Sequence, residues 1–266
     1  KQKEVEGKTI FLSTIHAANS EVVSNLSNYD CVIIDEASQI NIPMSFVPMS
    51  LSNNIQLVGD HFQLPPIFSE EIVEKSENQE PFVSIFETIW NNTEGLMNSE
   101  ERKNLFNQYR MVKEIIAYPS QLFYSDKITT DAKVELEQKE FINSINNEWE
   151  SSALSGVIDP NIPSVWLQVD STDLDSARSN PGEADYCNKI IIDLLKTGVN
   201  PDQIGIISPF RLQVNTIKNN IYSSLGEENP DILDTIQIDT IDRFQGSQKD
   251  IILISLCSSD LKNNFL

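Results

Sequence analysis

Two short apolar runs, each followed within two residues by an acid, most constrain the fold of this chain. The first run with its acids is CVIIDE at residues 31–36, and the second is IQLVGD at residues 55–60. Runs of this length bounded by turn residues predict buried strands. Residues 43–52 are long enough for a short crossover helix interrupted by proline, and a crossover joins parallel strands. We therefore predict that one edge of a sheet receives the side chains of Asp35, Glu36, Asp60 and Gln63.

The acidic pair after the first run suits phosphate chemistry. A carboxylate at the carboxyl end of a parallel strand can hold the water shell of Mg²⁺, and a second can orient or deprotonate an attacking water. These roles fall to Asp35 as the metal residue and Glu36 as the catalytic base, a Walker B pattern. Gln63 suits a sensor of the terminal phosphate, because an amide donates to phosphate oxygen and accepts from water. A plain strand-to-turn boundary is the alternative for the acidic pair.

The whole chain alternates between strand and helix patterns, which predicts an α/β fold with parallel sheets flanked by helices. A polar stretch with a glycine at residues 91–101 predicts a boundary between domains of residues 1–98 and 99–266. Proline at position 119 limits the first helix of the second domain. The further predicted strands are 8–14, 165–169, 204–207 and 251–256, and the predicted helices are 102–118, 183–195 and 214–225.

Composition sets limits on partners. The formal net charge of −21 is the opposite of the basic surface that supplies most non-specific nucleic-acid affinity. A motor that tracks a single strand can still bind a few nucleotides through a local groove and stacking.

The sequence contains three cysteines, Cys31, Cys187 and Cys257. They are odd in number and lie in apolar stretches, which predicts buried thiols without disulfides or metal. No apolar run is long enough for a membrane span and no signal peptide begins the sequence, which predicts a cytoplasmic protein without membrane contact.

Four ordered segments carry a resemblance to a known family. DEASQ (35–39), GDHFQLPP (59–66), QYRM (108–111) and T-x-D-x-FQG-x-x-KD (240–250) resemble motifs of superfamily 1B helicases of the Upf-like branch. The likeness extends through further segments at 84–87, 123–124, 180–184 and 204–213 and is weakest at 127–160. It implies two RecA-like lobes, the first of them incomplete. It also implies an ATP-dependent helicase or translocase on single-stranded DNA or RNA, moving 5′ to 3′ and hydrolysing ATP with Mg²⁺ in the cleft between the lobes.

The resemblance also assigns nucleotide-binding residues. Arg110 matches an arginine finger that reaches the γ-phosphate, for which a surface arginine capping a helix end is the alternative. Tyr109 matches the residue that packs on adenine. The family usually has an acid at the position of Gln248, and His-Pro in place of residues 112–113, so this chain departs from the pattern at both places. The residues assigned to the nucleotide are Asp60, Gln108, Tyr109, Gly246 and Gln248.

Three hydroxyls at predicted strand ends are candidates for contact with the sugar-phosphate backbone, where they would position the strand without reading its sequence. A helix N-cap is the alternative for each of them. These residues are Thr14, Ser208 and Thr240.

The tripeptide GKT at residues 7–9 does not match a phosphate-binding loop. Such a loop needs a glycine five residues earlier, where this chain has Gln2, and it follows a strand, whereas here the strand comes after. We therefore expect an internal segment of a longer helicase, with the rest of that chain as its partner, and no activity from the segment alone. The rival hypothesis is a catalytically inactive helicase-like module that binds nucleic acid or acts as a scaffold. Retention of the acid pair, Gln63 and Arg110 argues against it.

Overall fold

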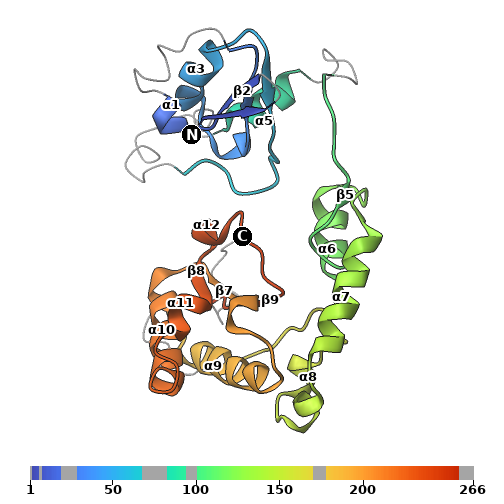
Figure 1. Cartoon of the computed structure of the whole chain (residues 1–266), viewed down its shortest axis with the longest axis vertical. Coiled ribbons are helices and arrows are strands. Elements are labelled where there is room, and N and C mark those ends of the chain that lie inside the picture. The colour runs from blue at the N-terminus through green and yellow to red at the C-terminus, as the bar shows by residue number, and fades with distance from the viewer. Residues whose placement is uncertain are drawn as a thin grey trace. The chain divides into compact units, whose positions relative to one another are not determined.

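The computed structural model describes residues 2–5, 8–18, 29–67, 83–93, 101–169 and 178–257. The chain divides into two compact units, Lys1–Asn104 and Leu105–Leu266, coloured from blue to green and from green to red in Figure 1. Each unit contains a short parallel sheet flanked by helices, which confirms the predicted α/β class. In the ranges described above, no helix is both long enough and apolar enough to cross a lipid bilayer.

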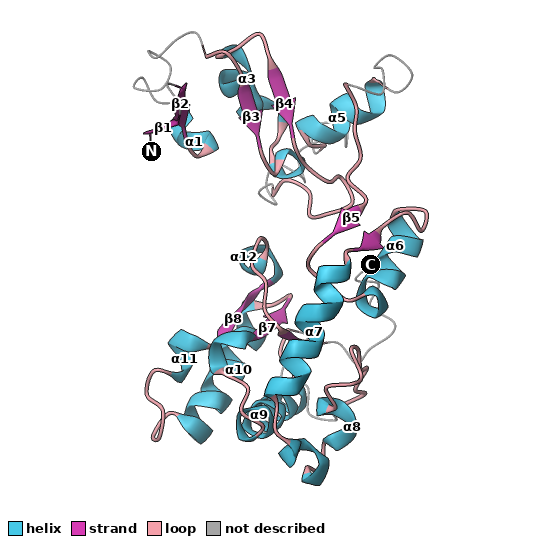
Figure 2. Ribbon diagram, turned by 45° about the vertical axis from the view of Figure 1, so that its right-hand side comes forward, coloured by secondary structure: helices cyan, strands magenta, loops and turns pink. Residues whose placement is uncertain are grey.

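The first unit contains the predicted βαβ arrangement. Strand β3 (Val32–Ile34) pairs in parallel with β4 (Ile55–Leu57), and helix α3 (Ile42–Ser50) lies between them in the sequence (Figure 2). The Asn41 side chain caps α3 by accepting from the backbone N–H of Met44. The other elements are β1 (Gln2–Val5), antiparallel to β2 (Lys8–Phe11), α1 (Ile15–Ala18), η1 (Ala37–Gln39) and α5 (Ile85–Asn92).

Strand β3 is less buried than the apolar run predicts. Ile34 is buried, but Ile33 on the opposite face is 64% exposed, because successive side chains of a strand point to opposite faces. Cys31 is also exposed, so the prediction of a buried thiol is wrong there. Cys187 and Cys257 are buried as predicted, and burial raises the pKa of the Cys187 thiol to about 12. All three cysteines are free thiols.

The core of the second unit surrounds the central strand of a three-stranded parallel sheet. Strand β7 (Ile204–Ser208) lies between β8 (Gln237–Thr240) and β9 (Ile251–Ile254). Helices α9 (Pro181–Lys196) and α10 (Arg211–Leu225) pack against each other and close the core. The fully enclosed isoleucines of this core are Ile191, Ile204, Ile206, Ile217, Ile221 and Ile236. Three short helices complete this part: η4 (Pro201–Gln203), α11 (Ile232–Thr235) and α12 (Ile241–Phe244).

The segment before this core departs most from the sequence predictions. Residues 165–169 form no strand. Trp166 within them is 77% exposed, and none of the strands in the described part of the chain pairs with this run. The helix predicted at 102–118 is also wrong, because a strand occupies the middle of that range and the helix starts later. The observed elements are β5 (Asn107–Gln108), parallel to β6 (Thr129–Thr130), α6 (Lys113–Phe123), α7 (Ala132–Ser144), η3 (Asn147–Ser151) and α8 (Ser155–Ile158).

Helix α6 continues through Pro119, which was expected to limit it. A proline removes one helical hydrogen bond, but Ser120 secures the end of this helix. Its carbonyl accepts from the N–H groups of Tyr124 at 3.0 Å and Asp126 at 2.9 Å, and its hydroxyl accepts from the N–H of Ile128 at 3.2 Å. Ser120 is buried, so these bonds are shielded from water.

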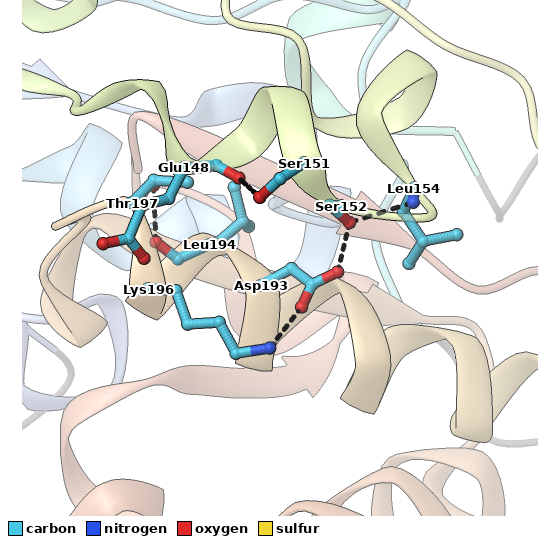
Figure 3. Close-up of polar contacts among 8 residues, drawn as sticks. All are labelled: Glu148, Ser151, Ser152, Leu154, Asp193, Leu194, Lys196 and Thr197. Atoms are coloured by element: carbon cyan, nitrogen blue, oxygen red, sulfur yellow. Dashed lines mark hydrogen bonds and ion pairs between the residues drawn. The ribbon is translucent and has the colours of Figure 1, made fainter.

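A polar junction joins η3 to the carboxyl end of α9 (Figure 3). The Ser152 hydroxyl donates to the Asp193 carboxylate, and Lys196 Nζ lies 2.9 Å from Asp193 Oδ1. The hydrogen bonds from Lys196 and then Ser152 lower the pKa of Asp193. Helix α9 ends just before η4 and the start of β7, so this junction belongs to the amino edge of the sheet. It ties the connecting segment to α9 and lies at the edge of this sheet opposite the strand ends that carry Ser208 and Thr240.

Candidate active site

The two acid-bearing loops of the first unit are tied together beyond the ends of their strands. The N–H of Val58 donates to the Ile34 carbonyl at 2.9 Å, and the N–H of Ala37 donates to the Val58 carbonyl at 2.8 Å. The N–H of Asp60 donates to the buried hydroxyl of Ser38 at 3.4 Å. The structure therefore places the acids after β3 and the polar residues after β4 at one sheet edge, as the parallel strands predict.

The acidic pair after β3 is exposed and sharply turned. Glu36 adopts a left-handed backbone with φ 52° and ψ 39°, which is uncommon for a residue with a side chain. Its N–H donates to Asp35 Oδ1 at 3.0 Å, and its Oε2 accepts from the Gln39 amide at 3.1 Å. Neither carboxylate forms an ion pair with any residue that the structure describes. Both can therefore accept hydrogen bonds from water or approach a cation.

Asp35 fits a magnesium site completed by a nucleotide. Across the described ranges, no three His, Cys, Asp or Glu side chains cluster closely enough to hold a metal. Mg²⁺ is usually held by one or two carboxylates together with substrate phosphates and retained waters. An exposed carboxylate at a strand end meets that requirement, and Asp35 is the first such group after β3.

The loop after β4 folds back on its own carboxylate. Asp60 Oδ1 accepts from the N–H of Phe62 at 3.1 Å, and Asp60 Oδ2 accepts from the Gln63 amide at 3.0 Å. Gln63 is exposed, and the predicted phosphate sensor therefore rests against Asp60 in this structure. The same loop carries Gly59, and a Cβ atom there would lie 2.9 Å from the backbone nitrogen of Ser38.

An aromatic cluster that the sequence did not predict supports this loop. The ring of His61 lies 4.1 Å from that of Phe62 and 5.7 Å from that of Trp90, measured between centroids. Phe86 and Trp90 stack on α5, and the Arg102 guanidinium lies 3.6 Å above the Trp90 ring. The spacing of Phe86 and Trp90 by four residues on one helix face was the available signal. The cluster holds the GDHFQLPP loop against α5.

The QYRM segment begins with the last residue of β5 and continues into the loop before α6. Tyr109 is 62% exposed, and its hydroxyl accepts from the Asn107 amide at 2.9 Å. Arg110 is exposed, and its guanidinium has no hydrogen-bond or ion-pair partner within the part of the chain that is described. Arg110 precedes the start of α6, so it does not cap a helix end, which was the alternative.

Gln108 has partners other than the nucleotide that the sequence assigns to it. Its Oε1 accepts from the N–H groups of Arg110 and Met111, both at 2.8 Å, and its Nε2 donates to the Met111 carbonyl and to Thr130 Oγ1. The side chain is therefore committed to its own loop and to β6.

The carboxyl edge of the second sheet carries Ser208 and Thr240 opposite each other, because these residues are in register at the ends of β7 and β8. Ser208 is only 1% exposed, and its hydroxyl lies 3.4 Å from Cys257 Sγ. Burial keeps the Ser208 hydroxyl from solvent in this conformation, and the nucleic-acid contact predicted for it stays a prediction. Thr240 is largely buried and makes no side-chain cap bond to α12.

The remaining predicted residues differ in their accessibility. Thr14 Oγ1 accepts from the N–H of Ala17 at 3.2 Å, which is the helix-capping alternative for this residue. Gly246 has φ of 80°, a conformation that favours glycine, and a Cβ atom there would meet nothing within 4 Å. Gln248 is exposed. The backbone around Gly246 is therefore open to a ligand.

A buried polar network, also missed from the sequence, lies beside this edge. The Gln213 amide accepts from the N–H of Asn180 at 2.8 Å and donates to the Asn180 carbonyl at 3.0 Å and to Ser255 Oγ at 2.9 Å. Glu183 Oε2 accepts from the Ser255 hydroxyl at 2.6 Å and from the N–H of Cys257 at 3.0 Å. The network joins α9, α10 and the segment after β9. The sequence signal for this network was Gln213, a polar residue next to the apolar face of α10.

The chain matches AAA domain family models over residues 1–71 and 82–265. It is 30% identical over 263 residues to the DNA replication ATP-dependent helicase/nuclease JHS1 of Arabidopsis thaliana, covering 97% of this chain and 18% of that protein. It is 28% identical to the DNA replication ATP-dependent helicase/nuclease DNA2 of Homo sapiens, covering 97% of this chain and 24% of that protein. The DNA polymerase alpha-associated DNA helicase A of Saccharomyces cerevisiae is 27% identical, with 94% of this chain and 38% of that protein covered. The chain thus spans only part of each relative.

Proposed function

Because this chain belongs to the AAA-domain family of superfamily 1 helicases, we propose that it acts in an ATP-dependent helicase or translocase on single-stranded nucleic acid. The names of its relatives favour DNA as that strand. The resemblance of the motifs to superfamily 1B favours movement from 5′ to 3′. The observation that carries the proposal is the parallel β3–β4 edge, where two exposed carboxylates follow one strand and Asp60 and Gln63 follow the next.

Each polar residue at this edge has a proposed task. Asp35 would hold Mg²⁺ through its water shell, and the bound ion would neutralise charge on the phosphates. Glu36 would accept a proton from the attacking water or orient it, with Gln39 fixing one of its carboxylate oxygens at 3.1 Å. Gln63 would give up its hydrogen bond to Asp60 and form one to the γ-phosphate. Its side chain is exposed, so the amide is free to rotate away from Asp60.

The second unit would complete the reaction with an arginine. The Arg110 guanidinium is exposed and has no partner within the described ranges, so no ion pair there must break before it binds phosphate. Its planar fork can bind two oxygens at once and stabilise charge in the transition state. Exposed Tyr109 would supply a flat face for adenine, and the open backbone at Gly246 would lie near phosphate with Gln248 beside it. The proposal requires residues of both units to act on one ATP.

The nucleic-acid contacts would be few and independent of sequence. The net charge of −21 argues against a broad electrostatic grip. Thr14 is exposed and remains a candidate for backbone contact, while Ser208 and Thr240 are both buried in this conformation.

Strand separation by the full-length protein tests this proposal. We expect ATP-dependent unwinding of a DNA duplex with a 5′ single-stranded tail and none of a duplex with a 3′ tail. Asp35→Asn should abolish unwinding, because it removes the carboxylate proposed for Mg²⁺. Asp30→Asn is the matched control, since Asp30 is exposed at the other end of β3, and it should retain unwinding. Binding of the strand without ATP hydrolysis by the wild-type protein would instead favour the inactive scaffold.

A further inference from the structure

The Gln108 side chain uses all of its hydrogen-bonding capacity inside the second unit. A primary amide offers two N–H donors and two oxygen lone pairs. Oε1 accepts from the N–H groups of Arg110 and Met111, each at 2.8 Å. Nε2 donates to the Met111 carbonyl and to Thr130 Oγ1, the latter at 2.7 Å. No capacity is left for a nucleotide unless one of these bonds breaks.

These bonds hold the backbone of the loop that carries Arg110. The amide closes residues 108–111 into a tight loop, and one of its bonds goes directly to the N–H of Arg110. The other end of the amide reaches β6, where Thr130 is the register partner of Gln108. A further bond from the N–H of Asp131 to the Gln108 carbonyl, at 3.0 Å, secures the strand pair. The loop is thereby attached to a second element as well as to itself.

An arginine that must reach phosphate from a loop depends on a loop backbone that is held in one conformation. Its side chain is long and carries about 2 kcal/mol of rotamer entropy, so a mobile backbone would add to the freedom lost on binding. A displacement of roughly 1 Å from a residue outside the chemistry can slow a reaction by about 10²-fold. The Arg110 guanidinium has no partner of its own in the described part of the chain, so the loop backbone is what positions it.

We propose that Gln108 is a positioning residue for Arg110 and does not contact the nucleotide. This inference rests on the role of Arg110 proposed above. It replaces the nucleotide contact expected from the sequence, because that contact would leave the N–H of Arg110, the N–H of Met111 or the Met111 carbonyl without its partner.

The test compares four substitutions in the full-length protein by steady-state ATP hydrolysis with single-stranded DNA present, together with binding of a fluorescent ATP analogue. Gln108→Ala should lower kcat by about 10²-fold, with little change in the KM for ATP or in analogue affinity. Thr130→Val removes one partner of the amide and should lower kcat less. Thr129→Val is the matched control, because its hydroxyl makes only long contacts of 3.4 Å to Phe106 and Asn107, and it should keep the wild-type kcat.

Arg110→Ala and the Gln108→Ala/Arg110→Ala double variant complete a cycle. If Gln108 acts through Arg110, the double variant should be no slower than Arg110→Ala alone. Additive losses in kcat, or a Gln108→Ala variant that weakens analogue binding at unchanged kcat, would overturn the inference. Wild-type turnover by Arg110→Ala would instead refute the proposed role of Arg110 itself. Thr130→Val with wild-type behaviour, alongside a Gln108→Ala variant that has lost its fold, would also count against positioning through β6.

Discussion

At the scale of single residues, Gly59 shows how a motif glycine can serve packing. Gly59 begins the GDHFQLPP motif that follows β4. In the structure a Cβ atom at Gly59 would lie 2.9 Å from the Ser38 nitrogen, 3.3 Å from the Ala37 nitrogen and 3.2 Å from the ring of Phe86. The missing side chain therefore lets the loop after β4 lie directly on η1 and α5. The motif spacing located this residue, but only the packing of three separate segments explains it.

Replacing Gly59 with alanine should push the two acid-bearing loops apart. The added methyl meets backbone, which cannot rotate away, so we expect destabilisation of about 1–3 kcal/mol. Thermal unfolding followed by circular dichroism measures this. Gly156→Ala is the matched control, because a Cβ atom in that helical position would meet nothing within 4 Å, and it should be neutral or slightly stabilising. An unchanged melting temperature for Gly59→Ala would show that the loops do not pack as described.

At the scale of elements, the buried network around Gln213 joins pieces that are distant in sequence. Gln213 on α10 is fully buried and binds both backbone groups of Asn180, the residue that caps the start of α9. It also reaches Ser255, and through that hydroxyl the Glu183 carboxylate. Buried polar groups are costly when unpaired, so each member depends on the others. The network thus fixes the start of α9 and the chain after β9 to one another.

Gln213→Leu should destabilise the second unit, because the Asn180 N–H and carbonyl would lose their partner while buried. We expect a loss of about 3 kcal/mol. Hydrogen exchange measured by mass spectrometry should show faster exchange at the start of α9 and around Ser255. The control is Gln121→Leu, the same change at an exposed position of α6, which should leave exchange in these segments unaltered. Equal protection in both variants would mean that the network is not needed.

The same scale separates what the sequence could predict from what it could not. Strands β3, β4 and β7 and helices α3, α9 and α10 were predictable, because apolar runs and helical spacing coincide with their packing. Strand β9 was predicted over 251–256 and spans Ile251–Ile254, where Ile254 is 64% exposed although the run is apolar. The helix expected at 102–118 failed because the side chain of Gln108 bonds to the backbone at Arg110 and Met111 and stabilises a loop. These local bonds, and the pairing of β5 with β6 that places Gln108 beside Thr130, leave no periodic signal in the sequence.

At the scale of the whole molecule, the helicase family is indicated by a few motif residues and not by the net charge of the chain. A formal net charge of −21 argued against a nucleic-acid partner, whereas the motif order and the AAA domain matches indicate a helicase family. The exposed acids after β3 and exposed Arg110 were all named from the sequence. The aromatic cluster around Trp90 and the four hydrogen bonds of the Gln108 amide were not, because His61, Arg102 and Thr130 complete them from other segments.

The Glu36→Gln substitution in the full-length protein tests the central claim most directly, because it separates ATP binding from hydrolysis. The amide keeps the size of the carboxylate but cannot accept a proton from water. Single-strand-stimulated ATP hydrolysis should fall by roughly 10²–10⁴-fold, while calorimetric ATP binding is retained. Glu140→Gln, at an exposed position of α7, is the matched control and should hydrolyse ATP at the wild-type rate. Near-normal hydrolysis by Glu36→Gln, or no single-strand-stimulated hydrolysis by the wild-type protein, would contradict a motor that uses the β3–β4 edge.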